Sequence, residues 1–324
     1  AGAEPNPSPR LDHVVAVIFN LEMAKVMRLK VAMMGFALAL TQVSATGCQM
    51  LAGKQLSGSV GTVETFIGGD QHDGVINIRE FGAVGDGTTN DADAFARALD
   101  ALPSRGGAIL FPPGYNYYLD SSSPSDFELA NKANITIFSY GQGARITVSK
   151  NTMLLAITNV THFRMSGLHI FGSLQTDGFL GNEVQGRVTV TACRHCEVAN
   201  NQWENTTQAI FAYSSDNFKI HHNDFINTFN PIETAGGIGA TNTNTWITDN
   251  YFLANNIIHG TTTHDDQIAT FSGPSGRLVI SRNIIDMQGD HPKSCCHGIL
   301  VDLNASQNGP EQNAQEVIIA DNVI

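Results

Sequence analysis

The residues best suited to chemistry in this 324-residue chain are acids and histidines of its C-terminal third. His264, Asp265 and Asp266 are consecutive, Glu233 precedes them, and His297 follows about thirty residues later. Two neighbouring carboxylates suit glycoside hydrolysis, because like-charge repulsion raises the pKa of one, making it a general acid, while the other stays ionised. A nearby histidine can relay the proton. The alternative is that Asp265 and Asp266 are solvated turn residues and His297 is a packed edge residue.

Whether these side chains meet depends on the elements that carry them, and an internal repeat predicts those elements. A six-residue unit with an aliphatic residue first and asparagine fourth recurs at Asn201, Asn223, Asn250, Asn283 and Asn322. Each unit is typical of a short strand, a tight bend and a second short strand, with aliphatic residues pointing inward at period two. Asparagine tolerates the left-handed conformation of a sharp bend. We therefore assign these asparagines to a structural ladder and not to catalysis.

The repeat predicts an all-β chain, a parallel β-helix whose coils are stable because they stack on one another. Asp91 and Asp93 are expected to cap an amphipathic helix over residues 94–102 that covers the open end of the first coil. The sequence stops at Ile324, inside the fifth unit. A β-helix normally ends in a cap, so we expect the C-terminal coils to be missing.

Equivalent positions on adjacent coils stack at about 4.8 Å. Aligning the coils on the asparagines places Thr206, Glu233 and Asp266 in one column, and aligning the next strand adds His297. This column is the densest titratable cluster of the chain, and it is our candidate catalytic site together with His264 and Asp265.

Two segments, residues 78–91 and 106–114, resemble the first coil of the pectate lyase-like right-handed parallel β-helix superfamily. That superfamily includes polygalacturonases, polysaccharide lyases, alginate epimerases and phage tailspikes. The resemblance implies a single-stranded right-handed β-helix and a polysaccharide substrate. It does not select a chemistry, because all of these activities share the fold.

Within that superfamily, Asp265-Asp266 followed by His297-Gly298 resembles the order of catalytic motifs in polygalacturonases. This resemblance implies a glycoside hydrolase with paired-carboxylate catalysis, which is the function we predict. The first polygalacturonase motif, Asn-Thr-Asp-Gly, is absent, and Glu233 stands in its place. The later Arg-x-Lys motif is absent before Ile324. Hydrolysis of galacturonan in particular is therefore doubtful.

A second interpretation is a polysaccharide lyase or uronan C5-epimerase, since the residues around His264 and His297 are also similar to alginate epimerase motifs. A histidine or tyrosine would then remove the proton beside a uronate carboxylate, whose charge a cation must offset. Lys293 and Arg277 are the candidate substrate-binding cations, and Tyr213 is the candidate acid. Ca²⁺ stays open as a cofactor under this interpretation alone.

A third interpretation is a non-catalytic glycan-binding or adhesin β-helix. Trp203 and Trp246 fall on inward-looking repeat positions or their edges, so they supply no exposed sugar platform. The cysteine pairs Cys193/Cys196 and Cys295/Cys296 have spacings that could suggest zinc. Buried filling of the solenoid is the simpler reading, and we predict no metal site.

The N-terminal region and the composition indicate where the protein is located and limit the partners that it can bind. Basic residues before the apolar stretch 31–40 predict a signal peptide, and small residues before Cys48 resemble a lipoprotein processing site. We therefore expect a leader and signal peptide over 1–47, a linker over 48–74 and the β-helix over 75–324, in a secreted or cell-envelope protein. A lipid anchor at Cys48 would be its membrane contact. A net charge of −12 with 18 Lys and Arg argues against nucleic acid.

Overall fold

The computed structural model describes residues 74–121, 127–141, 143–172, 185–235, 242–255, 265–271, 276–288, 296–302 and 316–324. The predicted leader, Cys48, His264, Lys293 and Cys295 lie outside these residues. No helix in the described ranges is long and apolar enough to cross a membrane.

Three parallel sheets, which we name A, B and C, make up the described fold. Sheet A contains β1 (Val75–Asn77), β3 (Gly107–Leu110), β6 (Ala133–Phe138), β9 (Thr161–Ser166), β12 (Arg194–Ala199), β15 (Asp216–His221), β18 (Thr243–Thr248), β21 (Arg277–Ser281) and β24 (Glu316–Ala320). Sheet B contains β2 (Asp86–Asn90), β4 (Asn116–Leu119), β7 (Ala144–Val148), β10 (Leu168–Phe171), β13 (Gln202–Glu204), β16 (Asp224–Ile226), β19 (Tyr251–Asn255) and β22 (Ile284–Gln288). Sheet C contains β5 (Glu128–Ala130), β8 (Leu155–Thr158), β11 (Val188–Thr191), β14 (Ile210–Tyr213), β17 (Ile232–Ala235), β20 (Asp265–Thr270) and β23 (Cys296–Val301).

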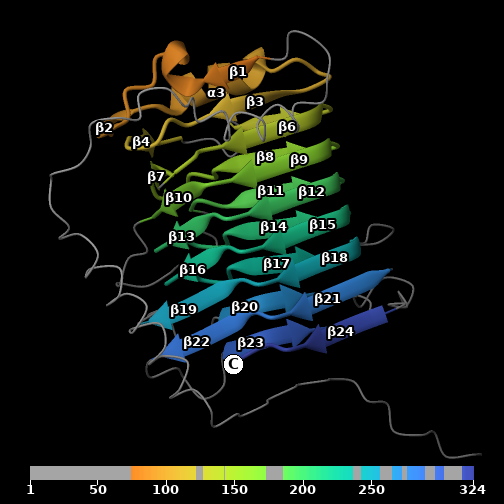
Figure 1. Cartoon of the computed structure of the whole chain (residues 1–324). Coiled ribbons are helices and arrows are strands. Elements are labelled where there is room, and N and C mark those ends of the chain that lie inside the picture. Colours follow the sequence, from red (N-terminus) through yellow and green to blue (C-terminus); the bar gives the residue numbers. More distant parts are fainter. Residues whose placement is uncertain are drawn as a thin grey trace, which may run out of the picture. The chain divides into compact units, whose positions relative to one another are not determined.

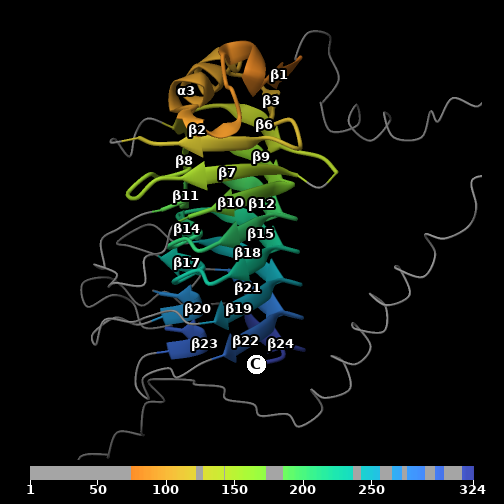
Figure 2. The ribbon, with the colours of Figure 1, turned by 90° about the vertical axis from the view of Figure 1, so that its left-hand side faces the viewer.

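From β5 to β22, each coil passes through one strand of sheet C, one of sheet A and one of sheet B before the next coil begins. The coil of β14, β15 and β16, for example, pairs strand by strand with the coil of β17, β18 and β19. Figures 1 and 2 show the coils stacked in sequence order, from the orange end to the blue end. This arrangement confirms the predicted right-handed parallel β-helix.

The core lies inside the coils and follows the period-two pattern of the strands. In β14, Ile210 and Ala212 are buried, whereas Phe211 and Tyr213 face outward. Inside sheet B, the rings of Trp203, Phe225 and Phe252 stack on successive coils, with centroids 5.4 and 4.9 Å apart. Stacking of equal positions thus produces a continuous apolar core that no single coil could form.

A helix covers the first coil, as the sequence predicted. The 3-10 helix η1 (Ile78–Phe81) precedes α3 (Ala92–Ala101), whose buried face includes Phe95, Ala98 and Leu99. Asp91 occupies the N-cap position but makes no side-chain capping bond. Its carboxylate instead accepts the N–H groups of Val84 and Gly85, at 2.7 and 3.1 Å. Asp91 therefore fixes the turn before β2, which corrects its predicted capping role.

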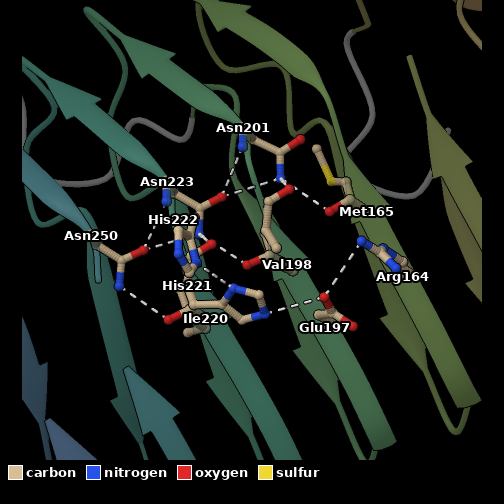
Figure 3. A network of polar contacts seen from close by, with 11 residues as sticks. Arg164, Met165, Glu197, Val198, Asn201, Ile220, His221, His222, Asn223 and Asn250 are labelled. Carbon is tan, nitrogen blue, oxygen red and sulfur yellow. Dashed lines mark hydrogen bonds and ion pairs between the residues drawn. The ribbon is translucent and has the colours of Figure 1, made fainter. Parts of the chain in front are cut away.

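The asparagine ladder is confirmed. The side-chain Oδ1 of each ladder asparagine accepts the backbone N–H of the preceding one, at 3.0 Å in all four steps from Asn201 to Asn322. Figure 3 shows three of its members, Asn201, Asn223 and Asn250, in one line. The first four members are 0–3% exposed, so the ladder satisfies amides that water does not reach.

The left-handed residue of each bend is not the ladder asparagine, contrary to our expectation. It is the residue before it: Asn200, His222, Asp249, Arg282 and Asp321 have φ between 55° and 59°. In the earlier copy of the unit, Gly167 has φ 74°, and the N–H of Leu168 donates to Asn201 Oδ1 at 3.1 Å. The buried amide thus serves the ladder, while its less buried neighbour takes the left-handed conformation.

Cys193 and Cys196 form a disulfide, with both side chains buried. The sequence interpretation of buried filling is confirmed for their position, but it did not include a bond between them. The disulfide closes the bend from sheet C into β12.

Candidate functional site

The candidate site is built at the beginning of the sheet C strands, where Asp266 of β20 pairs in register with His297 of β23. Asp266 Oδ1 lies 2.7 Å from His297 Nδ1, and it also accepts the backbone N–H of His297 at 3.2 Å. Asp266 is 3% exposed, whereas the His297 side chain is 33% exposed. A buried carboxylate therefore orients a solvent-reaching imidazole, and the predicted proximity of these two residues is confirmed.

Glu233 does not stand in the column of Asp266, which corrects the predicted alignment. Glu233 pairs with Ala269 of β20 and with Phe211 of β14. The place predicted for Glu233 is taken by Asn230, whose Oδ1 accepts the N–H of Asp266 at 2.8 Å. Thr206 likewise leaves the column, since its hydroxyl contacts that of Thr228.

The cause of this misalignment is the placement of the loops. Asn250 and Asn283 are 33 residues apart in the ladder, but Asn230 and Asp266, which meet in sheet C, are 36 residues apart. Extra residues before or after a strand change the number of residues between the ladder asparagine and that strand. They leave the ladder itself intact. A uniform shift along the sequence therefore misplaced Glu233 by three positions.

Glu233 is nevertheless part of the same electrostatic site. Burial raises the pKa of Glu233 above its ordinary value of 4.5, and the charge of Asp266 adds to the increase, although Arg187 and Gln208 oppose it. Gln208 Nε2 donates to Glu233 Oε2 at 3.0 Å, and Arg187 donates to Gln208 Oε1 at 2.7 Å. A hydrogen-bonded chain thus connects a cation to the half-buried carboxyl group.

Two aromatic side chains lie on the same outward face of sheet C. Phe211 is adjacent to Glu233 in register, and the Arg187 guanidinium lies 5.7 Å from the centre of its ring. Tyr213, a predicted substrate-binding residue, lies two positions further along β14 and pairs with Ala235. Phe211 is therefore closer to the acids than Tyr213, and it offers an apolar surface beside them.

The other predicted site residues fall in different places. The backbone of Asp265 belongs to β20 and pairs with Cys296, whereas His264 and Lys293 lie outside the described residues. Arg277 begins β21 in sheet A, where it forms an exposed ion pair with Glu316 at 2.5 Å. Because Arg277 belongs to sheet A and not to sheet C, the structure does not bring it to the predicted column.

Trp246 corrects a further expectation. It lies on the outward face of β18, half-buried, with Lys219 Nζ 5.9 Å from its ring centre. Trp203 does face inward and is 0% exposed. Trp246 immediately precedes the buried Ile247, so strand alternation places it outside.

Sequence reasoning missed Arg187, Gln208 and Asn230, which connect the site. Gln208 and Asn230 each lie two residues before a buried isoleucine of sheet C, as Asp266 does. That shared offset was the signal available in the sequence. Among the residues that the structure describes, no group of three or more His, Cys, Asp or Glu side chains could hold a metal ion.

Comparison with known proteins supports the architecture. No family model matches the chain. The mannuronan C5-epimerase AlgE3 of Azotobacter vinelandii is 24% identical over 270 residues, which are 74% of this chain and 14% of the relative. Alginate lyase 7 of the same organism is 37% identical over 71 residues, 22% of this chain and 8% of the relative. The chain thus spans less than a quarter of the length of these two relatives.

Two solved structures have similar folds. The A-module of the A. vinelandii mannuronan C-5 epimerase AlgE6 has a TM-score of 0.54 at 16% identity, covering 76% of this chain and 64% of that one. The tailspike of E. coli bacteriophage HK620, in complex with a pentasaccharide, has a TM-score of 0.51 at 15% identity, covering 81% and 58%. At these identities the likeness concerns the fold. The chain is therefore a right-handed parallel β-helix protein, like the epimerase module and the tailspike.

Proposed function

We propose that the chain is a polysaccharide-active enzyme that removes a proton beside a uronate carboxylate, as a lyase or a C5-epimerase does. His297 is the base, and Asp266 is the residue that positions it. The observation that carries the proposal is the hydrogen bond of 2.7 Å between His297 Nδ1 and the buried Asp266.

This geometry favours proton abstraction for a physical reason. A carboxylate that accepts from Nδ1 fixes the orientation and tautomer of the ring, so that the other nitrogen, Nε2, is the one that takes a proton. The same carboxylate stabilises the imidazolium that results. Burial of Asp266 strengthens this effect, because water competes little for its charge.

The neighbouring side chains suit a uronate. Loss of the proton at C5 places negative charge beside the sugar carboxylate, and this charge needs a cation or hydrogen-bond donors. Arg187 contributes a positive charge at this face of sheet C, although burial lowers its pKa. Phe211 can pack against a sugar ring. The names of the relatives, which are mannuronan epimerases and an alginate lyase, favour uronate-containing chains.

A glycoside hydrolase is the second candidate, and the raised pKa of Glu233 favours it. A carboxyl group that stays protonated at higher pH can serve as the general acid. Asp266 would then be the second carboxylate. Against this role, Asp266 is 3% exposed and already bonded to His297, which leaves it little access to a sugar or to a water molecule.

The test is to incubate the full chain with alginate, polymannuronate and polygalacturonate in D₂O. A lyase yields ultraviolet-absorbing unsaturated uronates, an epimerase incorporates deuterium at C5 without cleavage, and a hydrolase yields new reducing ends alone. We expect one of the first two results. New reducing ends alone would favour the hydrolase, and binding without any of these products would favour a glycan-binding protein.

The residue assignment is tested with His297→Asn. Asparagine keeps a donor near the position of Nδ1 but removes the base, so turnover should fall by about 10²- to 10⁴-fold. His162→Asn, on the outer surface of β9, is the matched control and should keep full activity. Full activity of the His297 variant would show that His297 is not the base.

A further inference from the structure

A second concave site lies away from sheet C, at the bend between sheets A and B. It is an open cavity of about 300 Å³, lined by glycines of two successive bends and by polar side chains of this and the following coils, including His169, Gln202, His222 and Asp224. Its volume falls at the lower end of the range for small-molecule pockets. The lining comes from successive coils, so the cavity extends along the axis of the β-helix.

The glycines that line the cavity differ in how much space surrounds them. A Cβ on Gly143 would lie 2.6 Å from the carbonyl oxygen of Gly167, and one on Gly167 would lie 2.3 Å from that of Ser139, so both are needed for close backbone approach. A Cβ on Gly141, by contrast, would meet nothing within 4 Å. The cavity is thus open beside Gly141, and a side chain added there would enter it.

His221 and Glu197 determine which ring nitrogen of His222 donates a hydrogen bond and which one accepts. His221 Nε2 lies 3.1 Å from Glu197 Oε1, and His221 Nδ1 lies 2.8 Å from His222 Nδ1, as Figure 3 shows. The hydrogen bond from His221 lowers the pKa of Glu197, with Arg164 also contributing. An ionised Glu197 only accepts, so His221 donates from Nε2.

The tautomer of His222 follows from that donation. When His221 is neutral and donates from Nε2, it presents a lone pair at Nδ1. The bond of 2.8 Å then requires His222 to donate from its own Nδ1. His222 is left with Nε2 as an acceptor. The chain from Glu197 therefore makes His222 an acceptor toward anything that binds in the cavity.

His169 behaves in the same way. Its Nε2 lies 2.9 Å from Glu204 Oε2, and burial lowers the pKa of His169, which keeps the ring neutral. Donation to Glu204 leaves Nδ1 as the acceptor of that ring. With the carboxylate of Asp224, the cavity is rich in acceptors, and neither Lys nor Arg is among its described lining residues.

We propose that this cavity is a second carbohydrate subsite, which takes the hydroxyl groups of a neutral hexose unit. Sugar hydroxyls donate to the two imidazoles and to Asp224, while the amide of Gln202 donates in return. A uronate carboxylate, in contrast, would meet acceptors and a negative charge, which disfavours it. The subsite is independent of the chemistry proposed for sheet C.

The test is to titrate the full chain, labelled with ¹³C in histidine, with the methyl glycosides of mannose, glucose and galactose and with those of mannuronate and galacturonate. We expect at least one neutral glycoside to shift the ring signals of His222 and His169, with a lower dissociation constant than either uronate. Absence of binding by all three neutral glycosides, or tighter binding of a uronate, would overturn the proposal.

Gly141→Asn locates the site, because asparagine tolerates the left-handed backbone of Gly141 (φ 63°) and fills the cavity. Gly114→Asn is the matched control, since Gly114 has φ 81° and also has nothing within 4 Å of an added Cβ, but does not line the cavity. We expect Gly141→Asn to abolish the shifts and Gly114→Asn to retain them. Equal binding by both variants, or equal loss, would contradict the assignment.

His222→Asn tests whether His222 Nε2 accepts a hydrogen bond from a sugar hydroxyl. The substitution suits the φ of 55° and should weaken binding by about tenfold, which corresponds to one hydrogen bond. His195→Asn, at φ 58° in β12, should bind as the wild type does. Unchanged binding by the His222 variant would remove His222 from the site.

Discussion

The corner between sheets A and B and the beginning of sheet C both join successive coils by hydrogen bonds from a backbone N–H to a side-chain oxygen. At the corner, the Oδ1 of each asparagine accepts the backbone N–H of the preceding ladder asparagine, at 3.0 Å in every step from Asn201 to Asn322. At the beginning of sheet C, Asn230 accepts from Asp266 at 2.8 Å and Asp266 accepts from His297 at 3.2 Å. Both sets of bonds join a side-chain oxygen to a backbone N–H of a neighbouring coil, but they run in opposite directions along the axis. At sheet C, in addition, the residue type changes from coil to coil.

This difference separates the structural role of the asparagine ladder from the proton transfer that we propose for sheet C. A ladder of identical amides is satisfied by its own members and by backbone carbonyls such as that of Ile220, and it has no titratable group. When an aspartate and a histidine occupy such a ladder, the backbone bonds hold them as firmly as the amides, and their protons become available. A repeat thus supplies rigid positions, and in the mechanism that we propose, substitution at two of them places a proton-transfer pair on a rigid element.

The comparison is tested most strongly by Asp266→Asn. The amide keeps the acceptor for the backbone of His297 but removes the charge that orients and stabilises its ring, so kcat should fall by about 10²- to 10⁴-fold. The melting temperature should change little. Asp286→Asn on sheet B is the control, measured with the same substrate, and it should be fully active. If Asp266→Asn retained full turnover, the sheet C ladder would be structural as well.

The second largest effect concerns the asparagine ladder itself. Asn250→Ala removes the buried side-chain bonds to Asn223, Asn283 and the Ile220 carbonyl, and the free energy of unfolding should fall by about 1–3 kcal/mol. Asn322→Ala, at the less buried end, should lose less. Denaturant unfolding of both variants measures this difference. Equal losses would show that position in the ladder does not matter.

Glu233→Gln should change how stability depends on pH. Burial raises the pKa of Glu233 above 4.5, so the folded protein takes up protons more readily at this residue than the unfolded chain. Stability from this group is therefore present below pH 4.5 and is lost as pH rises through the raised pKa. The melting temperature of the glutamine variant should gain on the wild type between pH 4 and pH 7. A constant difference would mean that Glu233 is not desolvated.

The smallest effect is expected at Arg282, whose guanidinium bonds both oxygens of Asp249 at 2.7 Å on the outer side of the ladder. This ion pair is exposed, so water and salt screen it. Arg282→Gln should leave the melting temperature nearly unchanged at physiological salt. A loss comparable to that of Asn250→Ala would show that the outer bend residues, and not the buried amides, hold the corner.

The sequence by itself determined the coil architecture, the ladder and the capping helix, because all three depend on local patterns. Period-two burial and the asparagine at a fixed place in each unit leave one way to stack the coils. The sequence also brought Asp266 and His297 together, since strand-to-strand alignment spans no insertion between Asp266 and Ile268 or between His297 and Ile299.

The tertiary structure decided the features that depend on the loops and bends between the repeated units. Loops on either side of a strand change the number of residues between that strand and the ladder asparagine. Asn230 therefore occupies the place predicted for Glu233, and Glu233 has Arg187 and Gln208 as its neighbours. The left-handed residues, the outward face of Trp246 and the Cys193–Cys196 bond also depend on the path of the chain around each bend. Hydrogen bonding keeps the corners in register whatever the loop length, but each loop is free to set where the next strand begins.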